Sequence, residues 1–101
     1  MKIPEKVKVL SKIYKVVVSD KVLALDNTVS YGLCDHNFPT ISINNKLQDE
    51  QGMHETFIHE LLHAIIKERN ITVEDNEVVV TELAKGLINV MIDNKNIFGE
   101  E

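Results

Sequence analysis

One short run constrains the fold of this chain more than any other feature. Every residue from Phe57 to Ile66 is apolar except His59, Glu60 and His63. On a helical wheel at about 100° per residue, these three lie within an arc of about 100°, and the two histidines are only about 40° apart. A helix this apolar must be buried on most sides, so the polar arc is predicted to lie inside the protein. Burying three ionisable groups together is costly unless something pairs them.

A divalent metal can supply that pairing, and the spacing favours zinc. Imidazoles at i and i+4 project from adjacent helical turns and can occupy two corners of a tetrahedron. Glu60 is predicted to point beside the metal, where it can take a proton from zinc-bound water and later pass it to a leaving amine. The run His59–His63 is therefore the HExxH arrangement. The alternative is a pair of core histidines that backbone or carboxylate groups satisfy.

A catalytic zinc site also needs a third protein ligand. Helices are predicted from about Asp49 to Arg69, with Asn70 as a C-terminal cap, and from about Val73 to Ile92. If these two form an antiparallel hairpin, position 63 lies opposite position 77 or 78.

Among the acids of the second helix, Glu77 best matches that register. It flanks an apolar stripe formed by Val80, Leu83, Ala84, Leu87 and Met91. We therefore predict His59, His63 and Glu77 as the zinc ligands. Two alternatives stay open: a first-turn glutamate favoured by the helix dipole, and His36 in a predicted loop as the ligand.

The first half of the chain is predicted to form strands. Val7 and Val9, and then Tyr14, Val16 and Val18, alternate with polar or lysine positions, which is the period of half-buried strands. Residues 31–35 and 40–43 are typical of two more strands, whereas residues 19–30 are ambiguous. The prediction is one α+β domain over residues 1–101, in which a small antiparallel or mixed sheet packs on the two helices.

Composition excludes several classes of function. The net charge is −5, which does not favour nucleic acid or an anionic membrane as a partner. Cys34 is the single cysteine, so the chain cannot form an internal disulfide or a cysteine-rich zinc site. No signal peptide or membrane-spanning run is visible, and a cytoplasmic location is expected.

The motif followed by Glu77 on the next helix resembles the gluzincin pattern. Residues 40–43, 55–65 and 83–87 add a likeness to small prophage and mobile-element metallopeptidases of the ImmA/IrrE group, in which Gly32 and Asp35 match a Gly-x-x-Asp strand end. This resemblance implies a zincin-like minimal catalytic core, a small sheet on an active-site helix and a glutamate-bearing helix.

We therefore expect a zinc metalloendopeptidase in which zinc-bound water attacks a peptide carbonyl and Glu60 is the general base. A peptide or protein substrate is expected to add as a strand at residues 40–43. Tyr31, His36 and His54 are candidates for stabilising the oxyanion. The alternative function is a non-catalytic, zinc-stabilised module of a phage or mobile element that binds a partner protein.

Overall fold

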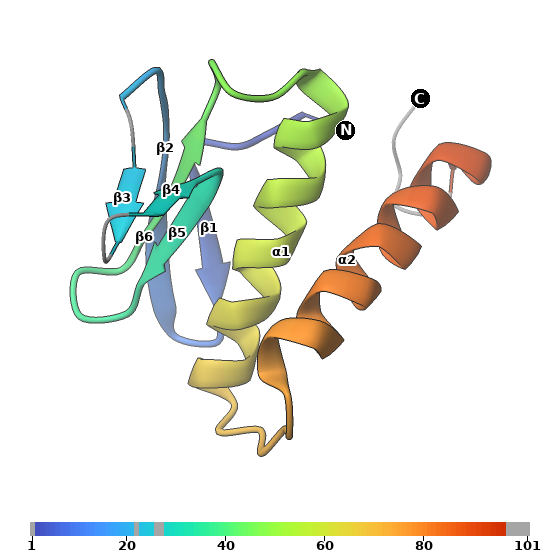
Figure 1. Ribbon diagram of the computed structural model, residues 1–101. Helices are drawn as coiled ribbons and strands as arrows, with labels where there is room; N and C mark the ends of the chain where they lie inside the picture. Colours follow the sequence, from blue (N-terminus) through green and yellow to red (C-terminus); the bar gives the residue numbers. More distant parts are fainter. Residues whose placement is uncertain (1, 22, 26–27, 97–101) are drawn as a thin grey trace.

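The protein is built from a four-stranded sheet and two helices on one side of it (Figure 1). A computed structural model describes residues 2–21, 23–25 and 28–96. The strand order is β1-β2-β6-β5, in which β2 and β6 are parallel and the other neighbours antiparallel. The bounds are β1 Lys6–Val9, β2 Lys12–Ser19, β5 Gly32–Asp35, β6 Thr40–Asn44, α1 Glu50–Glu68 and α2 Asn76–Asp93. The predicted α+β class, with a small mixed sheet and two helices, is confirmed.

The alternating sequence of β2 places one side of the sheet in the core. Tyr14 and Val16 are buried, whereas Ile13, Lys15 and Val17 are exposed. The four predicted strands are all present. The ambiguous stretch contributes a separate two-stranded ladder, β3 (Leu23–Leu25) and β4 (Thr28–Ser30), while positions 22, 26 and 27 lie outside the described residues.

Strand β6 lies inside the sheet, so the prediction of an added strand at residues 40–43 is wrong. Its residues pair with β2 on one side and with β5 on the other, which leaves no free edge to accept a peptide. The edge strand on this side of the main sheet is β5. Sequence periodicity predicts strands but not their lateral order, because the order depends on contacts distant in the chain.

Helix α1 is held at both ends. Asp49 is its N-cap and accepts a hydrogen bond from the Gly52 N–H at 2.8 Å. At its other end Asn70 adopts a left-handed φ of 54°, the Asn70 N–H donates to Lys67 O, and the Ile71 N–H donates to Ile66 O. These two bonds form a Schellman motif, which ends the helix and turns the chain toward α2. The C-cap residue is Arg69, and the predicted capping residue Asn70 is the left-handed residue directly after it.

Helix α2 starts three residues later than the predicted Val73. Asp75 takes a left-handed conformation with φ 48° and makes no side-chain cap, so the start signal at residues 72–75 belongs to the turn. The buried residues of the helix are Val80, Ala84 and Ile88. Leu83, which the sequence places in this stripe, is 53% exposed, because the buried stripe follows the i, i+4 row through Val80, Ala84 and Ile88.

The core lies between the sheet and α1. Its buried side chains come mainly from β2, β6 and α1, with Ala84 and Ile88 added by α2. In Figure 1 helix α1 lies between the sheet and α2. None of the helices in the described ranges is long and apolar enough to cross a membrane.

Candidate metal centre

The three predicted ligands come together where α2 begins beside the middle of α1. His59 and His63 lie one turn apart on α1, and Glu77 is in the first turn of α2. The two imidazole Nε2 atoms are 3.2 Å apart, and the Glu77 carboxylate oxygens lie 2.6 Å from His59 Nε2 and 3.2 Å from His63 Nε2. The predicted hairpin register, with position 63 opposite position 77, is therefore confirmed.

The geometry and the donor types of these residues fit a zinc ion. At zinc–nitrogen distances of ~2.0–2.1 Å, two ligands at tetrahedral corners lie ~3.3 Å apart. The observed Nε2–Nε2 separation of 3.2 Å matches that value, and the three ligand atoms all lie within 4.8 Å of one another. The same atoms also have partners without a cation, because the two Nε2 atoms lie within hydrogen-bond distance of each other and each lies beside a Glu77 carboxylate oxygen. Two imidazoles and one carboxylate also leave a fourth position for water or substrate.

The two histidines are shielded from solvent, whereas the glutamate is not. Each histidine side chain is 20% exposed, and that of Glu77 is 71% exposed. Burial lowers the pKa of His63, although the Glu77 charge acts in the opposite direction. The neutral form of the imidazole, which is the form that binds metal, is therefore favoured.

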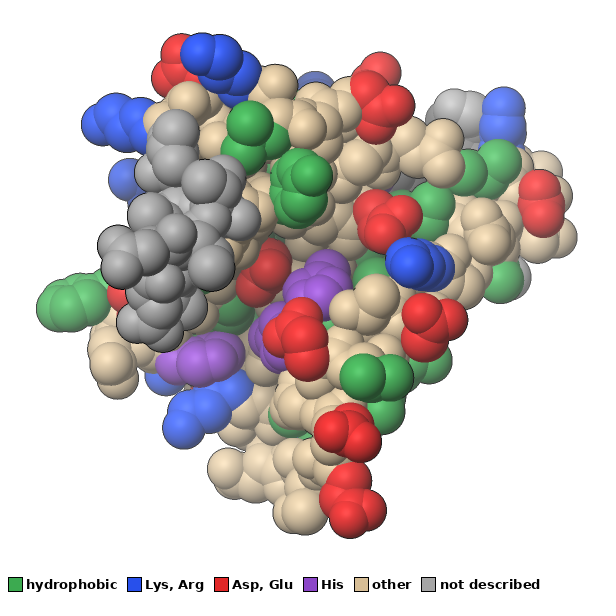
Figure 2. All heavy atoms as spheres, in the orientation of Figure 1, with side chains coloured by type: hydrophobic (Ala, Val, Ile, Leu, Met, Phe, Trp, Pro, Cys, Tyr) green, Lys and Arg blue, Asp and Glu red, His purple; other side chains and the backbone are tan. Residues whose placement is uncertain are grey.

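Glu60 lies on the same face of α1 as the two histidines but is more deeply buried than they are. It is only 9% exposed, and burial, with a further contribution from the Glu77 charge, raises its pKa to about 7. A carboxyl group with a pKa near neutrality can both accept and donate a proton at physiological pH. The structure brings Glu60 to one cleft with His59, His63 and Glu77, whose opposite wall is formed by residues of β5 and His36. Histidine and acidic side chains gather in the middle of this face (Figure 2).

Gly32 allows β5 to approach α1 beside Glu60. A Cβ atom at position 32 would collide with Thr56 Cγ2, and it would come within 3.0 Å of the Ser42 carbonyl oxygen and 3.3 Å of Glu60 Cγ. Thr56 cannot easily turn away, because its hydroxyl donates to Gln48 Oε1 at 2.8 Å. The glycine of the predicted Gly-x-x-Asp strand end is therefore required sterically.

Asp35, the other end of that motif, organises the turn after β5. Its Oδ1 accepts hydrogen bonds from the Asn37 and Phe38 N–H groups at 2.9 and 3.1 Å. This Asx turn directs the chain from β5 into β6 and fixes the position of His36 between them.

Sequence reasoning missed the polar residues that join β6 to α1. Asn44 is 1% exposed, and its Oδ1 accepts from the Lys46 and Leu47 N–H groups. Gln48 then donates to Asn44 O at 2.6 Å and to Tyr31 O at 3.2 Å. The only signal in the sequence was the Asn44-Asn45 pair, which predicts a turn but not its link to the site.

The remaining candidates lie apart from the three-ligand group. His36 and His54 do not belong to the group of ligand atoms found in the described part of the chain, so the alternative of His36 as third ligand is not supported. Burial, followed by the charge of Glu60, raises the pKa of Cys34 to about 12, so Cys34 is a protonated thiol. His36 nevertheless lines the same cleft as the ligands.

Comparison of the chain with models of protein families, with curated proteins and with solved structures gave no match.

Proposed function

We propose that this protein is a zinc-dependent metallopeptidase with His59, His63 and Glu77 as zinc ligands and Glu60 as general base. The observation that carries the proposal is the convergence of two imidazole nitrogens and a carboxylate beside a separate, buried carboxyl group. A purely structural zinc site closes its coordination with four protein ligands, whereas three ligands beside a proton-transfer group are typical of hydrolytic sites.

Each residue has a distinct chemical role in this proposal. A zinc ion held here would lower the pKa of water and polarise the peptide carbonyl. Glu60 would accept a proton from the attacking water on a carboxylate oxygen and deliver it to the leaving nitrogen. Its buried position excludes bulk water from that transfer, and the raised pKa makes the return of the proton favourable.

The substrate would bind as an extended strand on the free edge of β5. The Asn44 N–H donates to Tyr31 O, so Tyr31 and Asn44 form a hydrogen-bonded pair of the antiparallel ladder. The alternation of such pairs directs the N–H and C=O groups of Gly32 and Cys34 away from β6. Both residues line the cleft that contains the zinc ligands and Glu60, so a peptide paired there would pass directly over the site.

The test is zinc content together with peptide cleavage in matched variants. Wild type is expected to bind one zinc ion and to cleave members of a peptide library, detected by mass spectrometry. Glu60→Gln is expected to keep the zinc and to lose cleavage by about 100-fold or more, because it cannot carry a proton between water and the leaving amine. Glu74→Gln, which neutralises an exposed carboxylate before α2, is the control and is expected to cleave normally.

The same experiment decides the alternative function, a zinc-stabilised binding module. Such a module would bind zinc in both the wild type and Glu60→Gln, cleave nothing, and keep its biological activity in the variant. Absence of zinc binding in the wild type would reject both functions.

A further inference from the structure

A buried polar cluster lies beside the metal centre and is not used by the proposed mechanism. Tyr14, from the middle of β2, is fully buried, and its hydroxyl donates to Glu68 Oε2 at 2.8 Å. The same hydroxyl lies 3.1 Å from His36 Nδ1. Lys12 Nζ lies 3.3 Å from the Glu68 carboxylate and donates to the His36 carbonyl oxygen at 3.4 Å. The cluster therefore joins β2, the end of α1 and the turn after β5.

These contacts determine which nitrogen of His36 carries the proton. Glu68 is a carboxylate, because the hydrogen bond from Tyr14 and the contact with Lys12 lower its pKa. A carboxylate only accepts, so the single Tyr14 hydroxyl proton points at Glu68. The Tyr14 oxygen must then accept at its 3.1 Å contact, and the donor is His36 Nδ1–H. Cys34 Sγ lies farther from the same nitrogen, at 3.8 Å, and its lone pairs can share that N–H, so the shorter Tyr14 contact determines the tautomer.

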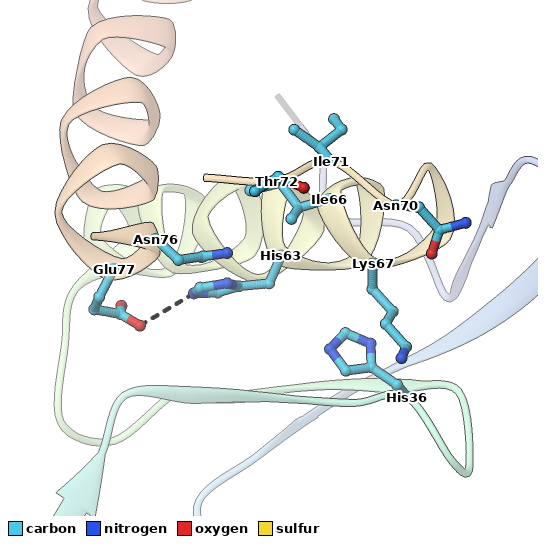
Figure 3. A pocket seen from close by; sticks show the side chains of 9 residues that line it. All are labelled: His36, His63, Ile66, Lys67, Asn70, Ile71, Thr72, Asn76 and Glu77. Atoms are coloured by element: carbon cyan, nitrogen blue, oxygen red, sulfur yellow. Dashed lines mark ion pairs between the residues drawn. The ribbon is translucent and has the colours of Figure 1, made fainter. Parts of the chain in front are cut away.

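His36 is consequently a neutral imidazole whose Nε2 has no proton. Burial lowers the pKa of His36, and the neighbouring Lys67 ammonium adds to that effect. The ring projects from the strand end into the cavity that His63 and Glu77 also line (Figure 3). Nδ1 contacts Tyr14 and Cys34, and no hydrogen bond to Nε2 is found among the described residues, so the Nε2 lone pair is open to a ligand.

We propose that His36 is a substrate-binding residue whose unprotonated Nε2 accepts a hydrogen bond from a main-chain N–H of the bound peptide. The inference rests on the proposed peptidase function and adds a specific contact to it. His36 directly follows β5, so a peptide extended along the free edge of that strand reaches the imidazole after leaving Cys34. Tyr14, Glu68 and Lys12 are positioning residues, because they act on the substrate only through the tautomer of His36.

This assignment excludes His36 as the group that stabilises the oxyanion. Stabilising an oxyanion requires a donor, and Nε2 of this tautomer can only accept. A peptide N–H is the complementary group, and the main chain of an extended substrate offers such donors at alternating positions.

The first test reads the tautomer directly in the full chain. Imidazole ¹⁵N chemical shifts are expected to show a protonated Nδ1 and an unprotonated Nε2 for His36 in the metal-free wild type. Tyr14→Phe keeps the packing of the ring but removes the oxygen that accepts from Nδ1–H, so it is expected to populate the other tautomer. A protonated Nε2 in the wild type, or an unchanged tautomer in Tyr14→Phe, would overturn the inference.

The second test locates the substrate N–H by kinetics with a peptide identified from the cleavage library. His36→Asn is the informative variant, since its amide can still donate to Tyr14 while the Nε2 acceptor is gone. It is expected to raise KM about 3- to 10-fold with kcat nearly unchanged, as for one neutral hydrogen bond. Ester peptides, in which one N–H at a time is replaced by oxygen, are expected to raise KM for wild type at one position and to have no such effect there in His36→Asn.

The outcomes separate this inference from the proposed function. Normal cleavage and equal ester sensitivity in His36→Asn would remove the contact and leave the peptidase intact. A wild type that binds zinc but cleaves no peptide would remove the function and the contact together, whatever the tautomer. His54→Asn, a histidine of α1 outside the cluster, controls for nonspecific effects of losing an imidazole.

Discussion

The two helices that form the proposed metal centre differ in how firmly capping and packing hold them in the fold. Helix α1 carries three of the four proposed site residues, is capped at both ends, and packs on β5, β6 and β1 as well as on α2. Helix α2 packs mainly on α1, begins without a side-chain cap, and supplies an exposed ligand. The comparison indicates that the fold holds the α1 part of the proposed site in place, whereas a metal bound at the proposed site would itself help to hold the start of α2 against α1.

Removing a proposed ligand from α1 is expected to have the largest effect. His63→Ala should weaken zinc binding by more than about 100-fold, since loss even of the partners that orient ligands costs about 10- to 100-fold. Competition with a chromophoric chelator measures this affinity, and His54→Ala on the same helix is the control. Zinc affinity equal to that of the wild type would show that α1 does not hold the metal through His63.

The buried carboxyl group of α1 should make the stability of the metal-free protein depend on pH. Burial raises the Glu60 pKa from 4.5 to about 7, so the folded state keeps its proton where the unfolded state has lost it. The contribution of Glu60 to stability is therefore complete below about pH 4.5 and is lost as the pH rises through about 7.

Glu60→Gln is accordingly expected to stabilise the metal-free protein by up to about 3 kcal/mol at alkaline pH and little at about pH 4. Urea unfolding in the presence of a chelator, at both pH values, measures the difference. Glu74→Gln should show no such pH-dependent gain. A gain of equal size at both pH values would mean that packing, and not ionisation, causes it.

The exposed ligand on α2 is expected to matter less than the histidines. Glu77→Ala should weaken zinc binding by about 10-fold, or ~1.4 kcal/mol, because water can reach the coordination position that the side chain leaves. Glu82→Ala, on an exposed part of the same helix, is the matched control. Unchanged affinity in Glu77→Ala would show that Glu77 is not the third ligand and that α2 lies beside a two-histidine site.

The difference between the helices also explains what the sequence could predict. The run from Phe57 to Ile66 has a periodicity that only a buried helix satisfies, so α1 and its polar arc were predictable from local pattern alone. The contact between His63 and Glu77 was predictable as well, because a short connection forces antiparallel neighbours into register.

Predictions failed where tertiary contacts decide between local alternatives. The sequence at residues 72–75 is compatible with a helix start, but the chain uses it to complete the turn after the Schellman motif. Leu83 matches the apolar period of α2 yet is exposed, because among the described elements α2 packs mainly on α1 and buries a narrow stripe. The Tyr14–His36–Glu68 cluster joins residues separated by up to 54 positions, and no local pattern indicates such a contact.

A substitution at Gly32 tests whether the fold requires the close approach of β5 to α1. Gly32→Ala is expected to destabilise the protein by about 2 kcal/mol, because the added methyl group overpacks the contact with Thr56 and the Ser42 carbonyl. Thermal and urea unfolding measure the loss. Gly32→Ala combined with Thr56→Ser, which removes the colliding methyl group but keeps the hydroxyl, should recover part of it. No recovery would place the strain at the Ser42 carbonyl instead.

The smallest expected effect is that of a substitution in α2 that raises helix propensity without changing any tertiary contact. Gly86 lies in the middle of α2 and is exposed, and apart from its chain neighbours and the backbone of its own helix no atom of the described residues lies within 4 Å of the position that a Cβ would occupy. Gly86→Ala should therefore stabilise the protein by about 0.5–1 kcal/mol, since alanine loses less backbone entropy in a helix. Gly52→Ala in α1 is the contrast, because a Cβ there meets Gln48 Cβ at 3.0 Å and the capping Asp49 Oδ1 at 3.1 Å. If both substitutions stabilise equally, then the first turn of α1 is no more constrained than the middle of α2, and the sheet contacts of α1, not its cap, must hold the α1 part of the proposed site in place.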